Sequence, residues 1–214
     1  MNKRTEFFFH VNRCGGIFVV AGLILFLVAC ARLEMQPKSP PSGKQDGLPI
    51  TVKGGTLQQG LTAVYFHNKY RHVDDMPATE EGIVKFGRPG PPILMLDNIF
   101  GRGKVFASGK SQEVGVLMRG YLHLDRPGQY LFQAKSNDGF QLFIDGNLVV
   151  SDPGVHGDRF SEPGQFKVVQ GGMFPVEIKY FQRKGTAMLQ LYWQPPGVSF
   201  LSIVPSGVYS HLGQ

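Results

Sequence analysis

The sequence predicts an all-β fold, an antiparallel β-sandwich, on the basis of three observations. Glycine and proline are frequent, at 28 and 15 of 214 residues, which indicates many turns. Aromatic residues reach 12% and favour strands. Short apolar segments alternate with turn residues at the spacing typical of a sandwich or barrel, and no long segment after the N-terminal region has helical periodicity.

The first 29 residues are predicted to be a lipoprotein signal peptide. Lys3, Arg4 and Arg13 make the start positive, and an apolar, uncharged run from Gly15 to Val28 follows. That run is shorter than the roughly 20 residues of a membrane span and suits a signal-peptide core. It ends in Leu-Val-Ala-Cys, which resembles a bacterial lipobox, so Cys30 is the expected site of acylation, for example with palmitate. The alternative is an uncleaved signal anchor with an incidental cysteine.

The only two cysteines, Cys14 and Cys30, both lie in this region. The remainder of the chain therefore has no disulfide and no thiolate metal site. The net charge is +6, without a dense Lys/Arg run, and this argues against nucleic-acid binding.

Residues 30–56 are predicted to be the lipidated cysteine and a flexible tether, because Pro, Gly, Ser and Lys dominate them. Residues 57–214 are predicted to form one domain. Its expected strands, in chain order, are 61–67, 114–124, 130–135, 140–144, 148–150, 166–169, 174–181 and 187–193, and the stretch 68–112 is less regular, with one dense apolar piece at 93–96. Asp145-Gly146-Asn147 predicts a tight hairpin turn, since such turns need positive φ.

Five ordered segments resemble the protective-antigen (PA-14) domain family. The central one is SNDGFQLFIDGNLVVSD, residues 136–152. The others are residues 60–66, 116–124, 127–132 and 171–181 followed by 189–193, and the ending 204–209 also fits. Gly154-Val155-His156-Gly157 is similar to the related fibro-slime branch. Residues 68–112 do not align with the family pattern.

The resemblance implies a β-sandwich that is usually a non-catalytic binding module, often for carbohydrate. Some adhesin members bind Ca²⁺ and sugar through two adjacent aspartates joined by a cis peptide. Here the pair is Asn137-Asp138, so one carboxylate is missing. The resemblance assigns ligand binding to Asn137 and Asp138, and Asp152 and the following loop residue Asp158 are added as candidate ligand-binding carboxylates. Weak Ca²⁺ binding or none is expected at Asp138, because affinity follows ligand charge. The alternative is a plain turn at Asn137-Asp138.

No catalytic constellation or motif stands out, so the chain is not expected to be an enzyme. The acid pairs Asp74-Asp75 and Glu80-Glu81 are interpreted as solvated surface. Trp193 belongs to an alternating apolar set and is expected in the core, whereas Phe160 and Tyr192 are better candidates for an exposed sugar platform.

These observations favour a lipid-anchored binding module of the cell envelope that recognises carbohydrate or a glycan-bearing partner. The expected location is the outer membrane or the outer face of the cytoplasmic membrane. The alternative is a structural or assembly lipoprotein that docks a protein partner through its sheet face or through residues 68–112.

Overall fold

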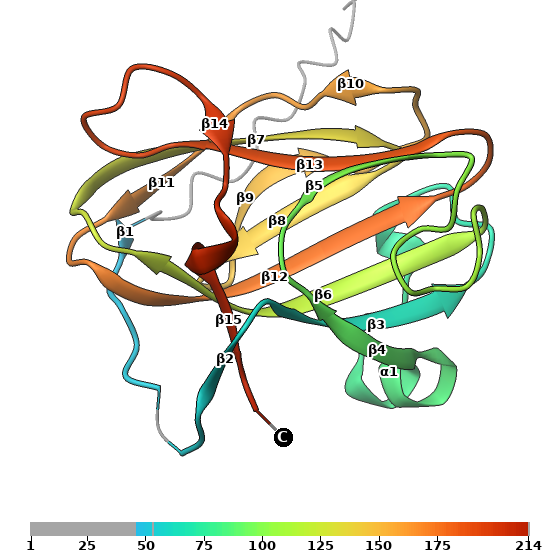
Figure 1. The fold of residues 1–214 in the computed structure, drawn as a ribbon, viewed down its shortest axis with the longest axis horizontal. Helices are drawn as coiled ribbons and strands as arrows, with labels where there is room; N and C mark the ends of the chain where they lie inside the picture. Colours follow the sequence, from blue (N-terminus) through green and yellow to red (C-terminus); the bar gives the residue numbers. More distant parts are fainter. Residues whose placement is uncertain (1–45, 53, 214) are drawn as a thin grey trace, which may run out of the picture. The chain divides into compact units, whose positions relative to one another are not determined.

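The computed structural model describes residues 46–52 and 54–213, so the signal peptide, Cys30 and most of the tether lie outside the described residues. Two β-sheets pack face to face in a sandwich, and nearly all of their strand pairs are antiparallel (Figure 1). The predicted antiparallel β-sandwich is confirmed. Within the described ranges, no helix is long and apolar enough to cross a membrane.

The first sheet has seven strands, in the order β1-β11-β7-β13-β14, with β10 beside β7 and β5 beside β13. Its strands are β1 (Asp46–Gly47), β5 (Asp97–Gly101), β7 (Gly128–Asn137), β10 (Arg159–Phe160), β11 (Gly164–Val168), β13 (Ala187–Gln194) and β14 (Ser202–Ile203). The short parallel pairing of β1 with β11 brings residues 46–47 onto the sandwich, and the amide of Ile50 also bonds the carbonyl of Met173 at 2.9 Å. The predicted domain boundary at residue 57 stays a prediction, and these contacts favour a domain that starts earlier in the chain.

The second sheet has eight strands, in the order β2-β15-β6-β12-β8-β9, with β3 beside β6 and β4 beside β3. Its strands are β2 (Leu57–Gln59), β3 (Leu61–His67), β4 (Arg88–Ile93), β6 (Val114–Leu124), β8 (Phe140–Ile144), β9 (Asn147–Asp152), β12 (Gly172–Gln182) and β15 (Tyr209–Leu212). The turn between β8 and β9 has φ values of 51° at Asp145 and 73° at Gly146, as predicted for this hairpin.

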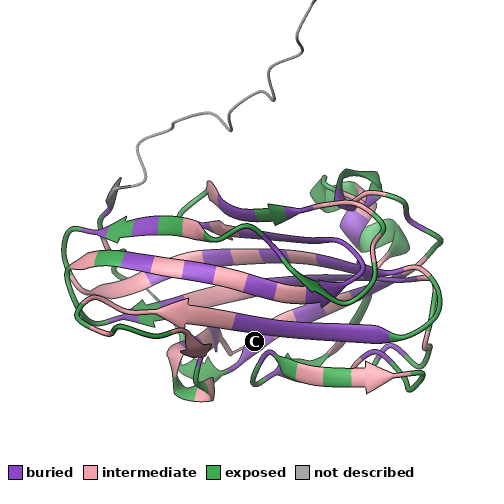
Figure 2. Cartoon of the chain, turned by 90° about the horizontal axis from the view of Figure 1, so that it is seen from above, coloured by how far each residue is buried: buried purple, intermediate pink, exposed green. Residues whose placement is uncertain are grey.

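The core lies between the two sheets and follows the two-residue period of the strands (Figure 2). On β7 and β13, alternate residues belong to this core, and the partly buried Trp193 packs against it as predicted. The bulk comes from aromatic side chains that are almost wholly buried, namely Phe132, Phe140, Phe166, Phe174, Tyr130, Tyr180 and Tyr209. Each large side chain removed from water contributes about 1.5–3 kcal/mol, so this layer supplies the stability that disulfides cannot.

The unaligned segment 68–112 covers part of the outer face of the eight-stranded sheet. This segment contains the 3-10 helix η1 (Val73–Asp75), the helix α1 (Glu80–Phe86), β4 and β5. Elsewhere in the chain, a second 3-10 helix, η2 (Ser206–Val208), precedes β15. A second, smaller apolar cluster lies beneath η1 and α1, formed by Phe66, Tyr70, Val73, Met76, Ile83, Leu117 and Phe181. Strand β4 has the sequence RPGPPI and pairs with β3 alone in the described chain.

Candidate functional site

Three loops converge on the predicted site residues Asn137, Asp138 and Asp158. They are the turn after β7 (137–139), the loop between β9 and β10 (153–158) and the turn between β12 and β13 (183–186). We call this set the loop cluster. Its positions follow from the pairing of β7 with β13 and of β12 with β8, which brings the ends of these strands together.

Asp138 is at the centre of the loop cluster and is 2% exposed. One carboxylate oxygen accepts the amide N–H of His156 at 3.1 Å, and the other accepts the amide N–H of Arg183 at 2.8 Å. Burial raises the pKa of the Asp138 carboxyl above its ordinary value, and the two amide bonds offset part of that effect. Asp138 therefore ties two loops to the end of β7. The peptide bond that precedes it is cis.

Asn137 connects the same turn to the loop cluster on its other side. Its side-chain nitrogen donates to Asp158 Oδ1 at 2.8 Å and to Thr186 Oγ1 at 3.3 Å. Its carbonyl accepts the hydroxyl of the buried Tyr180 at 2.7 Å. The predicted residues Asn137, Asp138 and Asp158 are thus brought together, with the exposed Asp158 carboxylate facing solvent at the rim.

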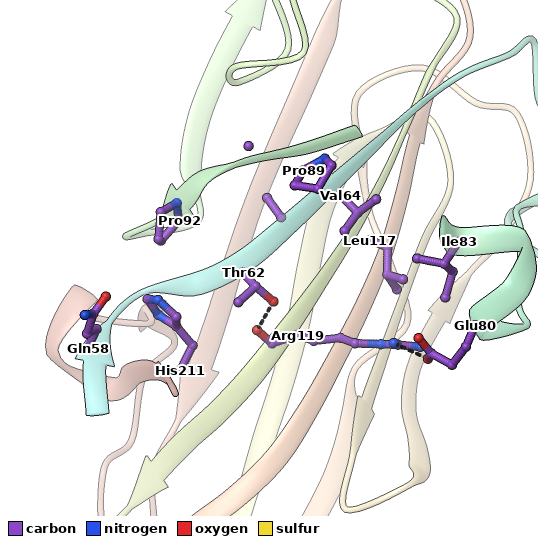
Figure 3. A pocket seen from close by; sticks show the side chains of 12 residues that line it. Gln58, Thr62, Val64, Glu80, Ile83, Pro89, Pro92, Leu117, Arg119 and His211 are labelled. Carbon is purple, nitrogen blue, oxygen red and sulfur yellow. Dashed lines mark hydrogen bonds and ion pairs between the residues drawn. The ribbon is translucent and has the colours of Figure 1, made fainter. Parts of the chain in front are cut away.

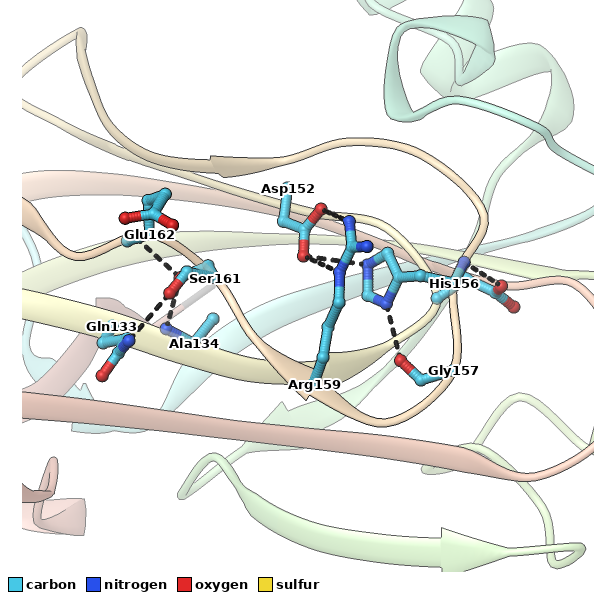
Figure 4. A network of polar contacts seen from close by, with 9 residues as sticks. Gln133, Ala134, Asp152, His156, Gly157, Arg159, Ser161 and Glu162 are labelled. Atoms are coloured by element: carbon cyan, nitrogen blue, oxygen red, sulfur yellow. Dashed lines mark hydrogen bonds and ion pairs between the residues drawn. The ribbon is translucent and has the colours of Figure 1, made fainter.

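Asp152 has different partners, shown in Figure 4. Its carboxylate receives the Arg159 guanidinium in a two-bond pair, with Nε at 2.8 Å from Oδ2 and Nη2 on Oδ1. His156 Nε2 lies 3.2 Å from Oδ2, an ion-pair distance at which the geometry falls short of a hydrogen bond. His156 Nδ1 is 2.8 Å from the carbonyl oxygen of Gly157, which only accepts, so Nδ1 carries a proton. Both oxygens of the Asp152 carboxylate are therefore occupied by the Arg159 guanidinium.

The loop cluster does not fit a strong calcium site. Ca²⁺ takes six to eight oxygen ligands, which the loop cluster and bound waters would have to supply together. Both Asp138 oxygens already accept amides, and Asn137 presents its nitrogen to Asp158. In the part of the chain that the structure describes, no three His, Cys, Asp or Glu side chains gather as a metal-binding group. The assignment of a ligand to these residues stays a prediction.

Two members of the loop cluster, Arg183 and Thr186, were not expected from the sequence. Arg183 contributes its backbone amide, which any residue except proline offers, so its identity carries no signal. Thr186 lies in a turn 49 positions from Asn137, and only the pairing of β7 with β13 brings the two together. A motif search cannot find such partners.

A second concave feature lies on the outer face of the eight-stranded sheet, beside α1 (Figure 3). This pocket has a volume of about 510 Å³, with an apolar floor that includes Val64, Ile83 and Leu117. At one end, Arg119 donates to Glu80 at 2.6 Å and to Glu177 at 2.8 Å. Glu80, predicted to be solvated surface, has a 76% exposed side chain but is an ion-pair partner.

The two aromatic residues expected at the surface are there. Phe160 is 49% exposed and Tyr192 is half-buried, and their ring centroids are 5.5 Å apart. Both lie on the outer face of the seven-stranded sheet. In the sequence, each follows within a few residues of a loop that belongs to the loop cluster.

The PA14 domain family model matches residues 96–206. No curated protein sequence matches the chain. Among solved structures, an anti-sigma factor domain-containing protein from Clostridium clariflavum is 18% identical with a TM-score of 0.58, covering 73% of this chain and 48% of that one. This chain thus spans about half the length of that relative.

Two matched structures have titles that mention sugars. A PA14 sugar-binding domain from an RTX adhesin is 20% identical with a TM-score of 0.53, covering 72% of this chain and 98% of that one. The epithelial adhesin 9 A domain from Candida glabrata, in complex with Galb1-3GlcNAc, is 12% identical with a TM-score of 0.55, covering 73% of this chain and 90% of that one. At these identities the structural matches show a shared fold. Since the family model spans more than half of the residues, this chain belongs to the PA14 domain family.

Proposed function

We propose that this protein is a lipid-anchored, non-catalytic binding module of the cell envelope whose ligand is a carbohydrate or a glycan-bearing partner. The observation that carries the proposal is the loop cluster at one end of a PA14 sandwich. It gathers carboxylate, amide and hydroxyl groups from three loops, and Asp158 is exposed among them. Sugar hydroxyls both donate and accept hydrogen bonds, so they pair well with such a mixed set.

The matched structures support a carbohydrate ligand. One is described as a sugar-binding domain, and another is solved with a disaccharide. A fold hosts many functions, so the ligand has to be tested on this chain itself. The buried Asp138 has a supporting role in the proposal, because it fixes the loops that carry the exposed groups.

The lipid anchor rests on the sequence Leu-Val-Ala-Cys that ends at Cys30. One acyl chain gives only marginal membrane binding, so a stable anchor needs more than one. Replacing Cys30 by Ser should move the protein from the membrane fraction to the soluble fraction. Unchanged membrane retention of the variant would favour an uncleaved signal anchor.

The carbohydrate proposal can be tested by screening the purified full chain on an array of glycans, with and without a calcium chelator. We expect saturable binding that the chelator leaves unchanged and that Asp158→Ala weakens. Asp158→Ala removes an exposed carboxylate without touching the two amide bonds of Asp138, so thermal stability serves as the control. Absence of binding to every glycan would refute the proposal.

Exposed apolar side chains favour a second candidate function, the docking of a protein partner. Leu94, Met95 and Ile99 are 53%, 39% and 70% exposed in the segment 68–112. Apolar groups grouped at a surface often mark protein contacts. Co-purification of one defined protein, lost when Ile99 is replaced by Ser, together with no glycan binding, would support this function instead.

A further inference from the structure

Side chains from four neighbouring strands line up across the outer face of the seven-stranded sheet. Phe160 of β10 is opposite Lys135 of β7, Lys135 is opposite Gln190 of β13, and Gln190 is opposite Asp97 of β5. Directly opposed residues share a face of the sheet. Tyr192 and Gln133 form an adjoining pair on the same face. We call these six residues the sheet-face row.

The row begins with two aromatic rings held at an angle to each other. Phe160 and Tyr192 have ring centroids 5.5 Å apart and an interplanar angle of 59°. Lys135 Nζ lies 5.4 Å from the centroid of the Phe160 ring, a cation–π contact that restricts both side chains. Phe160 remains 49% exposed, so this ordered ring presents apolar surface to the solvent.

The polar part of the row is also held in place. Gln190 is 9% exposed and lies between its partners. Its amide oxygen accepts the Tyr192 hydroxyl at 3.2 Å, and its amide nitrogen donates to Asp97 Oδ1 at 2.5 Å. The Gln133 amide donates to the carbonyl of Ser161 at 2.7 Å, which fixes its orientation. Binding to groups that are already ordered loses less conformational entropy.

This combination matches the two faces of a sugar ring. A pyranose ring carries C–H groups that stack on the negative face of an aromatic ring, and hydroxyls around its edge that need donors and acceptors. The row supplies the aromatic rings together with an ammonium, a carboxylate and amides. Lys135 and Asp97 carry opposite charges, so the row has no net charge to attract an ionic sugar.

The dimensions indicate how much of a glycan the row can contact. Neighbouring strands are about 4.8 Å apart, so residues on four strands span roughly 14 Å. That length accommodates two or three sugar rings. Because the residues stand on a sheet face, they are placed to meet the flank of a chain more readily than its end.

We propose that the sheet-face row binds a neutral oligosaccharide along its flank, with Phe160 and Tyr192 stacking on sugar rings and Lys135 and Asp97 bonding their hydroxyls. This inference rests on the proposed carbohydrate function and adds a second contact surface for the glycan, on residues outside the loop cluster. The chemical class is a neutral, extended chain of hexopyranose units.

The test measures binding of the full chain to neutral hexasaccharides, including cellohexaose, by isothermal titration calorimetry. Phe160→Ala and Tyr192→Ala should each weaken binding about tenfold, equivalent to about 1.4 kcal/mol. Tyr192→Phe keeps the ring and should lose less. Phe86→Ala is the matched control, because Phe86 is 60% exposed with Lys85 Nζ 5.3 Å from its ring, but lies on α1.

The outcomes distinguish binding at the sheet-face row from the proposed carbohydrate function as a whole. Weakening by Phe160→Ala and Tyr192→Ala, with unchanged thermal stability and an unaffected Phe86→Ala, supports the row. If the wild type binds glycans and these two variants bind equally well, or if it binds only charged glycans, the row is wrong while carbohydrate binding stands. If the wild type binds no glycan at all, the proposed function fails and the row fails with it.

Discussion

Replacing Asp138 by Ala should destabilise the fold, because this side chain ties two loops to the end of β7. The change removes both acceptors and leaves the amides of His156 and Arg183 without their partner. An unsatisfied buried donor costs about 1–3 kcal/mol. Two unsatisfied amides cost about 2–6 kcal/mol. Burying the Asp138 charge also costs free energy, as its raised pKa indicates, so removing the carboxylate offsets part of this loss. We therefore expect a net loss of about 2–4 kcal/mol in the free energy of unfolding.

Thermal and urea denaturation of the full chain at pH 7 measure this loss. For a domain of this size, 1 kcal/mol shifts Tm by about 2–4 °C, so Tm should fall by about 4–16 °C. Asp138→Asn retains one acceptor but sets its NH2 group, which only donates, against the other amide N–H, so its Tm should also fall clearly below that of the wild type. Asp125→Ala is the control, because the Asp125 side chain is 73% exposed and its loss should cost within about 0.5 kcal/mol. Equal Tm values for Asp138→Ala and the control would refute the reasoning.

Three further predictions concern packing, protonation and metal. Gly164→Ala should cost at least about 2 kcal/mol in urea denaturation, because the added methyl would overlap the carbonyl oxygen of Val149, whereas Gly207→Ala has nothing within 4 Å and should be neutral. The Asp138 carboxyl should titrate above 3.8 by carbon NMR. Since its folded pKa is raised, protonation of Asp138 adds stability that is fully present below the unfolded pKa and is lost as pH rises through the folded pKa, whereas the two amide bonds of the carboxylate persist at pH 7; a value below 3.8 would contradict this. Calorimetry with Ca²⁺ should show weak binding or none, and tight binding that persists in Asp138→Ala would place a metal elsewhere.

Local signals predicted much of the fold. The two-residue alternation on β7 and β13 identified the buried face, including Trp193, and Asp145-Gly146 identified a hairpin by its need for positive φ. The segment 68–112 could not be predicted in the same way. Its helix α1 is only seven residues long, its strand β4 contains three prolines, and its order depends on packing against the outer face of the sheet.

The candidate site was only partly visible in the sequence. Asn137 and Asp138 were expected from the resemblance and Asp158 from the loop after β9, and the structure brings all three into the loop cluster, where Asn137 donates to Asp158. Asp152 was expected with them but forms its closest contacts with Arg159 and His156. The Asp152 carboxylate could have faced either the loop cluster or the Arg159 guanidinium, and only the folded structure shows which partner it takes.

Strand β4 has a consequence for whether copies of the protein can associate with one another through their sheets. It is an edge strand, and edge strands with free amides recruit the strands of neighbouring molecules. Pro89, Pro91 and Pro92 have no amide hydrogen to donate, so a second chain cannot build a regular ladder along this edge. The three prolines therefore oppose edge-to-edge pairing of molecules along β4, and with it one route to aggregation.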